Sequence, residues 1–348
     1  MNFTNNALRL EDLSPPLQGK IGWPWTEEGS QLPDVMPDGS EWPRISIVTP
    51  SYNQGQFIEE TIRSVLLQGY PNLEYIIIDG GSADSTIEII KNYEPWISYW
   101  VSEKDSGQSD ALNKGFALSN GVICAYINSD DIFLPNAMAK VISAYANNSE
   151  LKWTAFSVLC GESLTDHRVW YPYAAKLPYF VVNQTIAQPG VFWRSDIQAK
   201  PWFDVNRHIN MDHKFFIENY LKFNAPLINL ESIAFFRLHT NSKTYQPSNL
   251  WEQEYSTLLD EVSKLVDNQT VSAIQKEKTR LNYTSQIAML LSRKDQSIDS
   301  KLSSLNEAIK IFFATPFVFR DRIFTSGLIR VILQLFEINK FKVKGRGE

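Results

Sequence analysis

The sequence predicts an α/β fold with a mainly parallel sheet flanked by helices, followed by a C-terminal helical appendage. From residue 44 onward, short apolar segments alternate with amphipathic ones, which is the pattern of a βαβ series. Several apolar segments end in polar or acidic residues, as strands do where an open sheet binds its ligand. We therefore expect an extended leader over residues 1–43, a sheet domain over 44–245 and a helical region over 246–348.

The composition is that of a folded, cytoplasmic protein. Hydrophobic residues make up 43% of the 348, which is enough for a core, and the formal net charge of −6 argues against binding to nucleic acid. The two cysteines, Cys124 and Cys160, support neither a disulfide scaffold nor a cysteine metal site. We find neither a signal-peptide segment nor an apolar run near the ~20 residues that span a bilayer.

The leader is rich in proline, glycine and tryptophan and has no sustained periodicity. Large aromatic side chains are seldom left in water. Trp23, Trp25 and Trp42 therefore predict that the leader packs on the body of the protein.

The first half of the sheet domain, residues 44–134, reads as strands separated by amphipathic helices. Asp84 or Ser85 is suited to cap the second of these helices. The expected strands are Ile45–Thr49, Tyr75–Ile78, Ile97–Val101 and Val122–Ile127. One expected helix carries apolar positions from Phe57 to Leu66, a second reaches Tyr93, and a third begins near Gly107.

In the second half, residues 135–245, the alternation is looser. The expected helices are Asn136–Tyr145 and Met211–Leu221. The expected strands are Trp153–Cys160, His167–Tyr173, Gly190–Trp193 and Leu227–Leu238. Beyond residue 250 we expect helical segments, broken near Asp295 and Pro316.

Two adjacent carboxylates, Asp130 and Asp131, follow the apolar run Val122–Ile127 after only two polar residues. Neighbouring like charges repel unless they share a cation, and oxygen ligands suit Mg²⁺ or Mn²⁺ completed by substrate phosphates and water. The pair therefore predicts a metal site and a phosphate-bearing substrate. The alternative is a solvated turn that caps the helix beginning at Pro135.

Polar groups also follow the earlier strands, where neither a glycine-rich dinucleotide motif nor a phosphate loop is found. These groups are Ser51 to Asn53, Asp79, and Glu103 to Asp105. A row of this kind along one sheet edge exceeds what turns require, and it favours a binding site.

Four ordered motifs, at residues 45–53, 76–84, 110–115 and 128–131, together resemble glycosyltransferase family 2. The resemblance is strong over about 44–140 and weaker to about 240. It implies a GT-A, Rossmann-like fold and an inverting, nucleotide-sugar-dependent glycosyltransferase. Residues 44–134 would then be the nucleotide-sugar-binding half and 135–245 the acceptor half.

The resemblance also implies site residues. A divalent ion, Mn²⁺ or Mg²⁺, would be bound by Asp131 and His239, although a lone histidine is more often structural. The residues implied to bind the nucleotide sugar are Pro50, Ser51, Tyr52, Asp79 and Asp130. Many members carry an acidic residue, able to accept a hydrogen bond from uracil, where this chain has Gly80. A UDP-sugar is the first expectation, but the base stays open.

Met211-Asp212 resembles the acidic motif of the acceptor half, and Asp212 is the candidate general base. The alternative is a carboxylate favoured at a helix start by the helix dipole. Four tryptophans of this half include candidates to stack on a sugar ring, although we expect most of them in the core. They are Trp153, Trp170, Trp193 and Trp202.

The predicted function is transfer of a sugar to a hydroxyl of a glycan or lipid-linked acceptor in cell-surface polysaccharide biosynthesis. One rival is a sugar nucleotidyltransferase, which would want a basic, glycine-rich loop where Pro50–Gly55 has no lysine or arginine. The other rival is a catalytically inactive protein that binds a nucleotide sugar or glycan.

The C-terminal residues 320–348 hold seven basic residues against three acidic ones and adjoin short apolar runs. Such a segment suits peripheral contact with the anionic, cytoplasmic face of a membrane. The alternative is that the apolar runs pack on the protein itself.

Overall fold

The computed structural model describes residues 7–146, 148–243 and 250–292. The chain divides into two compact units, Met1–Lys264 and Leu265–Glu348. We expected the sheet domain to end at residue 245, and the first unit instead continues through the helix that follows. The basic segment 320–348 and the helix breaks expected near Asp295 and Pro316 lie outside the described residues.

In the described part of the chain, nine strands form one sheet in the order β3-β2-β1-β4-β8-β6-β9-β5, with β7 paired to β6. The first four pair in parallel, whereas β8 runs antiparallel to both β4 and β6. The strands are β1 (Ile45–Ser51), β2 (Leu73–Asp79), β3 (Tyr99–Ser102), β4 (Ile123–Tyr126), β5 (Ile132–Phe133), β6 (Trp153–Ser163), β7 (Asp166–Trp170), β8 (Val191–Arg194) and β9 (Leu227–Arg237).

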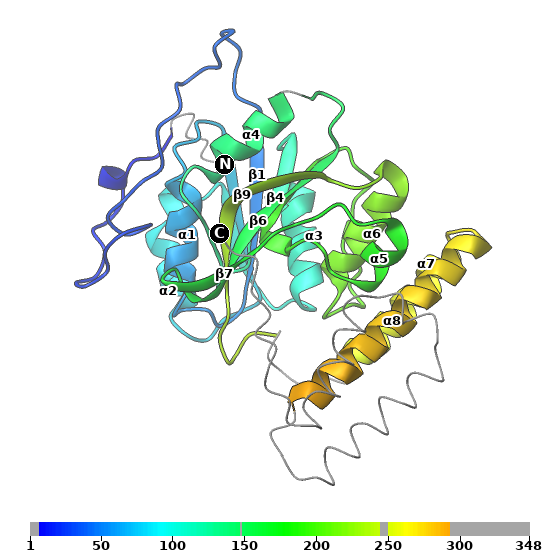
Figure 1. Ribbon diagram of the computed structural model, residues 1–348. Coiled ribbons are helices and arrows are strands. Elements are labelled where there is room, and N and C mark those ends of the chain that lie inside the picture. Colours follow the sequence, from blue (N-terminus) through cyan, green and yellow to red (C-terminus); the bar gives the residue numbers. More distant parts are fainter. Residues whose placement is uncertain (1–6, 147, 244–249, 293–348) are drawn as a thin grey trace, which may run out of the picture. The chain divides into compact units, whose positions relative to one another are not determined.

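Helices α1 and α2 lie on one side of the parallel strands and α3 lies on the other (Figure 1). Right-handed crossovers require this arrangement, because α3 connects β3 back across the sheet to β4. The helices of the first unit are α1 (Ile58–Leu66), α2 (Thr86–Asn92), α3 (Gln108–Leu118), α4 (Ala137–Ala146), α5 (Leu177–Val182), α6 (Met211–Phe223) and α7 (Leu250–Ser263). Helix α8 (Asn268–Ser292) belongs to the second unit.

The core is built around the parallel strands. Every residue of β1 is buried, and Ile77 in β2 has no exposed surface. Truncating such a side chain to alanine costs about 2–5 kcal/mol of stability. Helix α3 approaches closely because Gly115 has no side chain: a Cβ there would lie 2.5 Å from Val48 Cγ1.

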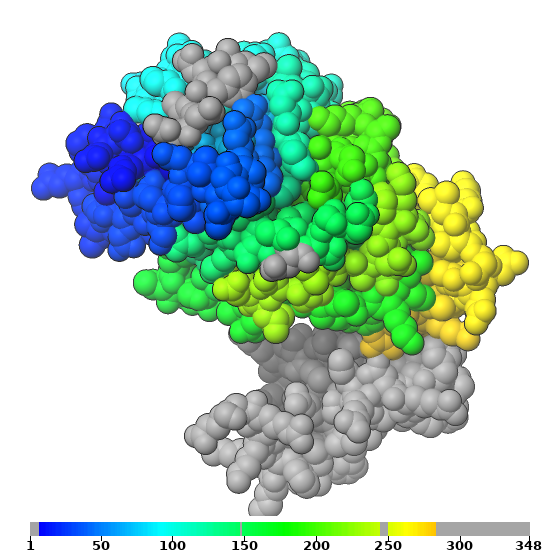
Figure 2. All heavy atoms as spheres, turned by 90° about the horizontal axis from the view of Figure 1, so that it is seen from above, coloured from blue at the N-terminus to red at the C-terminus, as the bar shows by residue number. Residues whose placement is uncertain are grey.

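The leader packs on the body of the protein, as expected. In Figure 2 its blue atoms lie against the cyan and green atoms of the sheet domain. Trp23 and Trp25 are buried, and the Trp23 indole N–H donates to the Phe133 carbonyl at 2.8 Å. The fully buried Arg63 donates from α1 to the leader carbonyls of Pro24 and Trp25.

The strands and helices expected over residues 44–134 are present with small shifts at their ends. Two short elements were missed, β5 and α5. Strand β5 has two residues and forms only because β9 pairs with it, so its own sequence carries no period. The strand expected over His167–Tyr173 ends at Trp170. In the described residues, no helix has the length and apolar character needed to cross a membrane.

Candidate active site

The loops that follow β1 and β2 are joined by hydrogen bonds at one edge of the sheet. Ser51 and Asp79, the last residues of the two strands, are register partners. The Asn53 backbone N–H donates to Ser82 Oγ at 2.7 Å, and the Gly55 backbone N–H donates to Asp84 Oδ2 at 2.9 Å. Each loop therefore fixes its neighbour.

Asp79 is fully buried, and its carboxylate organises its own loop. Its Oδ2 accepts hydrogen bonds from the backbone N–H of Ser82 at 2.9 Å and from Ser102 Oγ at 2.6 Å. Pro50 and Ser51 are also buried, whereas the Tyr52 side chain is 62% exposed. Of these four predicted nucleotide-binding residues, only Tyr52 has an exposed side chain.

The space beside Gly80 is taken by Asp105, which the sequence indicates only as a member of the polar row at the sheet edge. A Cβ at Gly80 would lie 2.9 Å from Asp105 Oδ2. Asp105 Oδ1 accepts from the backbone N–H of Gly107, which holds the loop after β3 in place. The glycine thus makes room for a carboxylate that arrives from another loop.

The adjacent carboxylates after β4 have different surroundings. Asp131 is 1% exposed; its Oδ1 accepts from the backbone N–H of Arg237 at 2.9 Å, and its Oδ2 accepts from Asn128 Nδ2 at 3.3 Å. Burial, and then the charge of Asp130, raise the pKa of the Asp131 carboxyl well above its usual range. Asp131 is therefore tied into the protein on both oxygens.

Asp130 instead faces His239 at the end of β9. The distance between Asp130 Oδ2 and His239 Nε2 is 3.0 Å, and both side chains are partly exposed. Arg237 donates from its Nε to the Asp130 carbonyl and forms an ion pair with Glu60 at 2.8 Å. The end of β9 thus brings two basic side chains to the carboxylates after β4.

Lys243, which no sequence motif indicates, connects this cluster to the other half of the site. Its Nζ donates to Gln108 Oε1 at 2.9 Å, and Gln108 Nε2 donates to Asn128 Oδ1 at 2.7 Å. Burial lowers the pKa of Lys243, and this effect is opposed first by the charge of Asp212 and more weakly by that of Asp130. One cation therefore lies in the electric field of carboxylates from both halves.

Asp212 is the second residue of α6 and is half-buried. Its Oδ2 accepts from Gln184 Nε2 at 3.2 Å, and its Oδ1 accepts from the backbone N–H of His213. Burial raises the pKa of Asp212 to about 6. Burial also lowers the pKa of His213 to about 4, and this side chain lies 2.9 Å from the Phe180 carbonyl.

The segment that leads into α6 is held by Glu254 of α7. Glu254 Oε1 accepts from the backbone N–H of His208 at 2.8 Å, and Oε2 accepts from those of Ile209 and Asn210 at 3.0 and 3.2 Å. Nothing local in the sequence indicated this role, because the partners are more than forty positions apart. Helix α7 thereby positions the start of α6.

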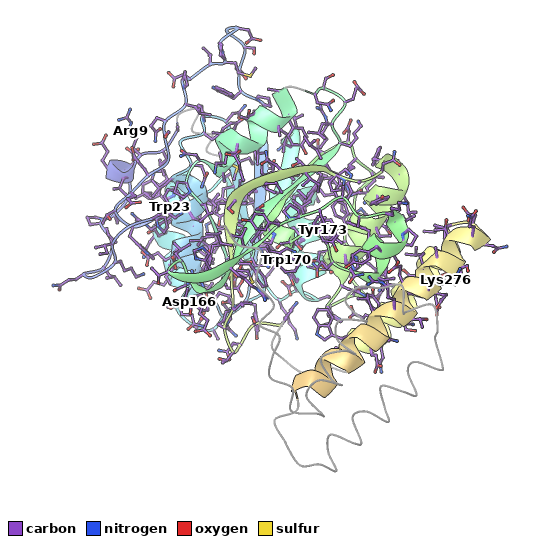
Figure 3. The ribbon with its side chains drawn as sticks, viewed as in Figure 1. Arg9, Trp23, Asp166, Trp170, Tyr173 and Lys276 are labelled. Atoms are coloured by element: carbon purple, nitrogen blue, oxygen red, sulfur yellow. The ribbon has the colours of Figure 1, made fainter. Side chains whose placement is uncertain are left out.

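Most tryptophans of this half belong to the core, as expected. Trp153, Trp193 and Trp202 are all buried. Trp170 is half-exposed at the end of β7, and Figure 3 labels it together with Tyr173 of the following loop.

Residues 46–187 match the family described as Glycosyl transferase family 2. An uncharacterized glycosyltransferase of Mycobacterium tuberculosis (strain ATCC 25618 / H37Rv) is 31% identical over 182 residues, which cover 50% of this chain and 68% of that protein. The putative teichuronic acid biosynthesis glycosyltransferase TuaG of Bacillus subtilis is 34% identical over 121 residues, covering 34% of this chain and 48% of TuaG.

Solved structures show the same fold. The crystal structure of S. aureus TarS 1-349 matches with a TM-score of 0.52 and 16% identity, covering 85% of this chain and 91% of that one. The same protein in complex with UDP matches with a TM-score of 0.53 and 14% identity over 85% and 91% of the two chains. The GT-A fold expected from the sequence motifs is therefore confirmed.

Proposed function

The chain belongs to glycosyl transferase family 2 and is a glycosyltransferase, and from this premise we propose that it transfers a sugar, with inversion, from a nucleoside diphosphate sugar to a hydroxyl of a glycan or lipid-linked acceptor. The observation that carries the proposal is the position of Lys243, whose Nζ donates to Gln108 Oε1 at 2.9 Å while Gln108 bonds to Asn128, and whose pKa the charges of Asp212 and Asp130 both raise. This supports one site that contains both a candidate base and the donor-side carboxylates.

We assign the nucleotide to the linked loops after β1 and β2. Tyr52 offers an exposed aromatic face to the base, Pro50 and Ser51 shape the strand end beneath it, and Asp79 holds the loop. Asp105 supplies a carboxylate beside Gly80, where it can accept a hydrogen bond from a base N–H. Because the TarS structure binds UDP, a UDP-sugar is the first donor to test.

The residues present fit a divalent ion, Mn²⁺ or Mg²⁺, at Asp130 and His239. In the described residues no group of three acidic, histidine or cysteine side chains converges, so two protein ligands would be completed by the diphosphate and water. The motif assigned the ion to Asp131, but Asp131 is 1% exposed and accepts a hydrogen bond on each oxygen, whereas the Asp130 side chain is 20% exposed beside His239, which favours Asp130. An ion bound there would stabilise the charge of the departing diphosphate.

Asp212 has the surroundings of a general base. A carboxylate whose pKa is about 6 is ionised near neutral pH and is still basic enough to accept a proton. In the proposed step it takes the proton of the acceptor hydroxyl while that oxygen attacks the anomeric carbon. The new glycosidic bond forms as the bond to the diphosphate breaks, and Lys243 stabilises the leaving group's charge.

We further propose that the product enters a cell-surface polysaccharide, because TuaG carries a name from teichuronic acid biosynthesis. A cytoplasmic location with peripheral contact of residues 320–348 at the membrane would bring the enzyme to a lipid-linked acceptor. That contact stays a hypothesis about residues outside the described part of the chain.

A thermal-shift screen tests the proposal, because a ligand that binds only the folded state raises the melting temperature. The screen compares UDP, GDP, UDP-glucose, UDP-galactose, UDP-N-acetylglucosamine and GDP-mannose, each with and without Mn²⁺. We expect stabilisation by one nucleotide and its sugar that depends on Mn²⁺. Stabilisation by a nucleoside triphosphate together with a sugar 1-phosphate would favour the nucleotidyltransferase. Binding without turnover over a broad acceptor panel would favour the inactive binding protein.

A further inference from the structure

A cavity of about 200 Å³ lies beside the candidate base. Its walls come from the start of α6, from α7 and from the loop after α5. The lining residues are Gln184, Ile209, Asn210, Asp212, His213, Trp251 and Tyr255. All of them belong to the first compact unit, and all except Gln184 lie beyond residues 46–187, which match the family.

The cavity has a polar part and an aromatic part. Asp212 and Gln184 supply a carboxylate and an amide that contact each other at 3.2 Å. Asn210 is 4% exposed; its Oδ1 accepts from Arg207, and its Nδ2 has no hydrogen-bond partner among the described residues. Trp251, which is 40% exposed, contributes the indole.

The aromatic wall is held in place by contacts on the following turn of α7. Glu254 accepts the backbone N–H bonds before α6, and Tyr255 Oη donates to the Val181 carbonyl of α5 at 3.1 Å. Trp251 lies one helical turn before Tyr255. Its position relative to Asp212 is therefore set by the fold.

We propose that this cavity is the acceptor subsite and that it takes the pyranose ring of a sugar, which stacks on Trp251 and presents a hydroxyl to Asp212. The proposal rests on the proposed transferase function and adds the acceptor's chemical class. A pyranose has an apolar C–H face and a polar rim of hydroxyls, and the cavity has the same division. An acyclic polyol has hydroxyls but no flat apolar face, so it gains nothing from the indole. The volume suits one sugar unit rather than several, since pockets for larger ligands start at about 300 Å³.

Saturation-transfer NMR on the full chain tests the proposal without requiring turnover. The probes are the methyl pyranosides of glucose, galactose, mannose and N-acetylglucosamine, with glycerol and ribitol as acyclic controls. We expect at least one pyranoside to bind through its ring C–H protons and neither polyol to bind. Trp251→Ala should weaken that pyranoside about tenfold, whereas Trp251→Phe should retain most of the affinity because it keeps a flat aromatic face.

Trp96→Ala is the matched control, because it removes a half-buried tryptophan from a turn between α2 and β3. It should leave pyranoside binding unchanged. UDP binding with Mn²⁺, measured by calorimetry on every variant, distinguishes failure of the acceptor subsite from failure of the proposed transferase function. Normal UDP binding with no pyranoside bound, or with equal binding of ribitol, would overturn the acceptor inference alone. If the wild-type chain binds no UDP, the proposed function is contradicted as well.

Discussion

The two halves of the sheet bring their functional side chains together in different ways. In the donor half, neighbouring parallel strands end side by side, and the loops after them bond directly to one another, as Asn53 does to Ser82. In the acceptor half, Gln184, Asp212 and Trp251 come from separate segments. The carboxylate of Glu254 and a few other hydrogen bonds hold those segments together. The donor site follows from sheet topology, whereas the acceptor site depends on particular long-range contacts, so mutations should separate the two.

The largest effect is expected in the donor half from Asp130→Asn. Since Asp130 faces His239 and Asp131 is bonded on both oxygens, Asp130→Asn should abolish Mn²⁺-dependent UDP binding and lower kcat/KM on the order of 10³-fold. Asp131→Asn is the matched control, and calorimetric titration of UDP with Mn²⁺ should show that it still binds the ion. Loss of the Mn²⁺ response in Asp131→Asn alone would return the ion to Asp131, as the motif suggested.

The next largest effect is expected where Glu254 of α7 holds the loop before α6 in the acceptor half. Glu254→Ala removes the acceptor of three backbone N–H bonds, so the loop before α6 should shift. We expect kcat to fall on the order of 10- to 100-fold and the free energy of unfolding to fall by about 1.5–3 kcal/mol. UDP binding should stay within twofold. Glu254→Gln, which keeps one acceptor oxygen, should be intermediate; a parallel loss of UDP binding would show that the halves are not separable.

The pH dependence of transfer gives a smaller effect. Asp212 acts as a base only when deprotonated, and burial places its pKa at about 6. The rate should therefore be at its plateau above pH 6 and fall about tenfold per pH unit well below it. A stopped assay with saturating donor and Mn²⁺ measures the profile. A falling limb that persists in Asp212→Asn would assign the titration to another group.

The smallest effect concerns the space beside Gly80. In Gly80→Ala the new Cβ would lie 2.9 Å from Asp105 Oδ2, so the Asp105 side chain has to move. We expect the KM for the donor to rise several-fold, which corresponds to a loss of roughly 1 kcal/mol of binding free energy, with kcat unchanged. Steady-state kinetics with varied donor measures it, and Asp105→Asn should give a similar rise. An unchanged KM in both variants would remove Asp105 from the donor site.

Much of the donor half could be predicted from the sequence, because the site residues there lie at the ends of apolar strands or a few positions after them. The local sequence could not predict which of Asp130 and Asp131 is buried, because the buried carboxylate is held by Asn128 and by Arg237, which is distant in the chain. The acceptor half was predicted less fully. Asp212 stood out as an acidic residue at a helix start, but Lys243 and Glu254 function through partners far away in the chain.

Donor binding and proton removal are assigned here to different halves of one site. Asp212→Asn tests this assignment most directly when UDP-sugar affinity and turnover are measured on the same preparation with Mn²⁺. We predict that the donor Kd stays within twofold of the wild-type value while kcat falls on the order of 10²- to 10⁴-fold. An unchanged kcat, or a loss of donor affinity as large as the loss of turnover, would contradict the account.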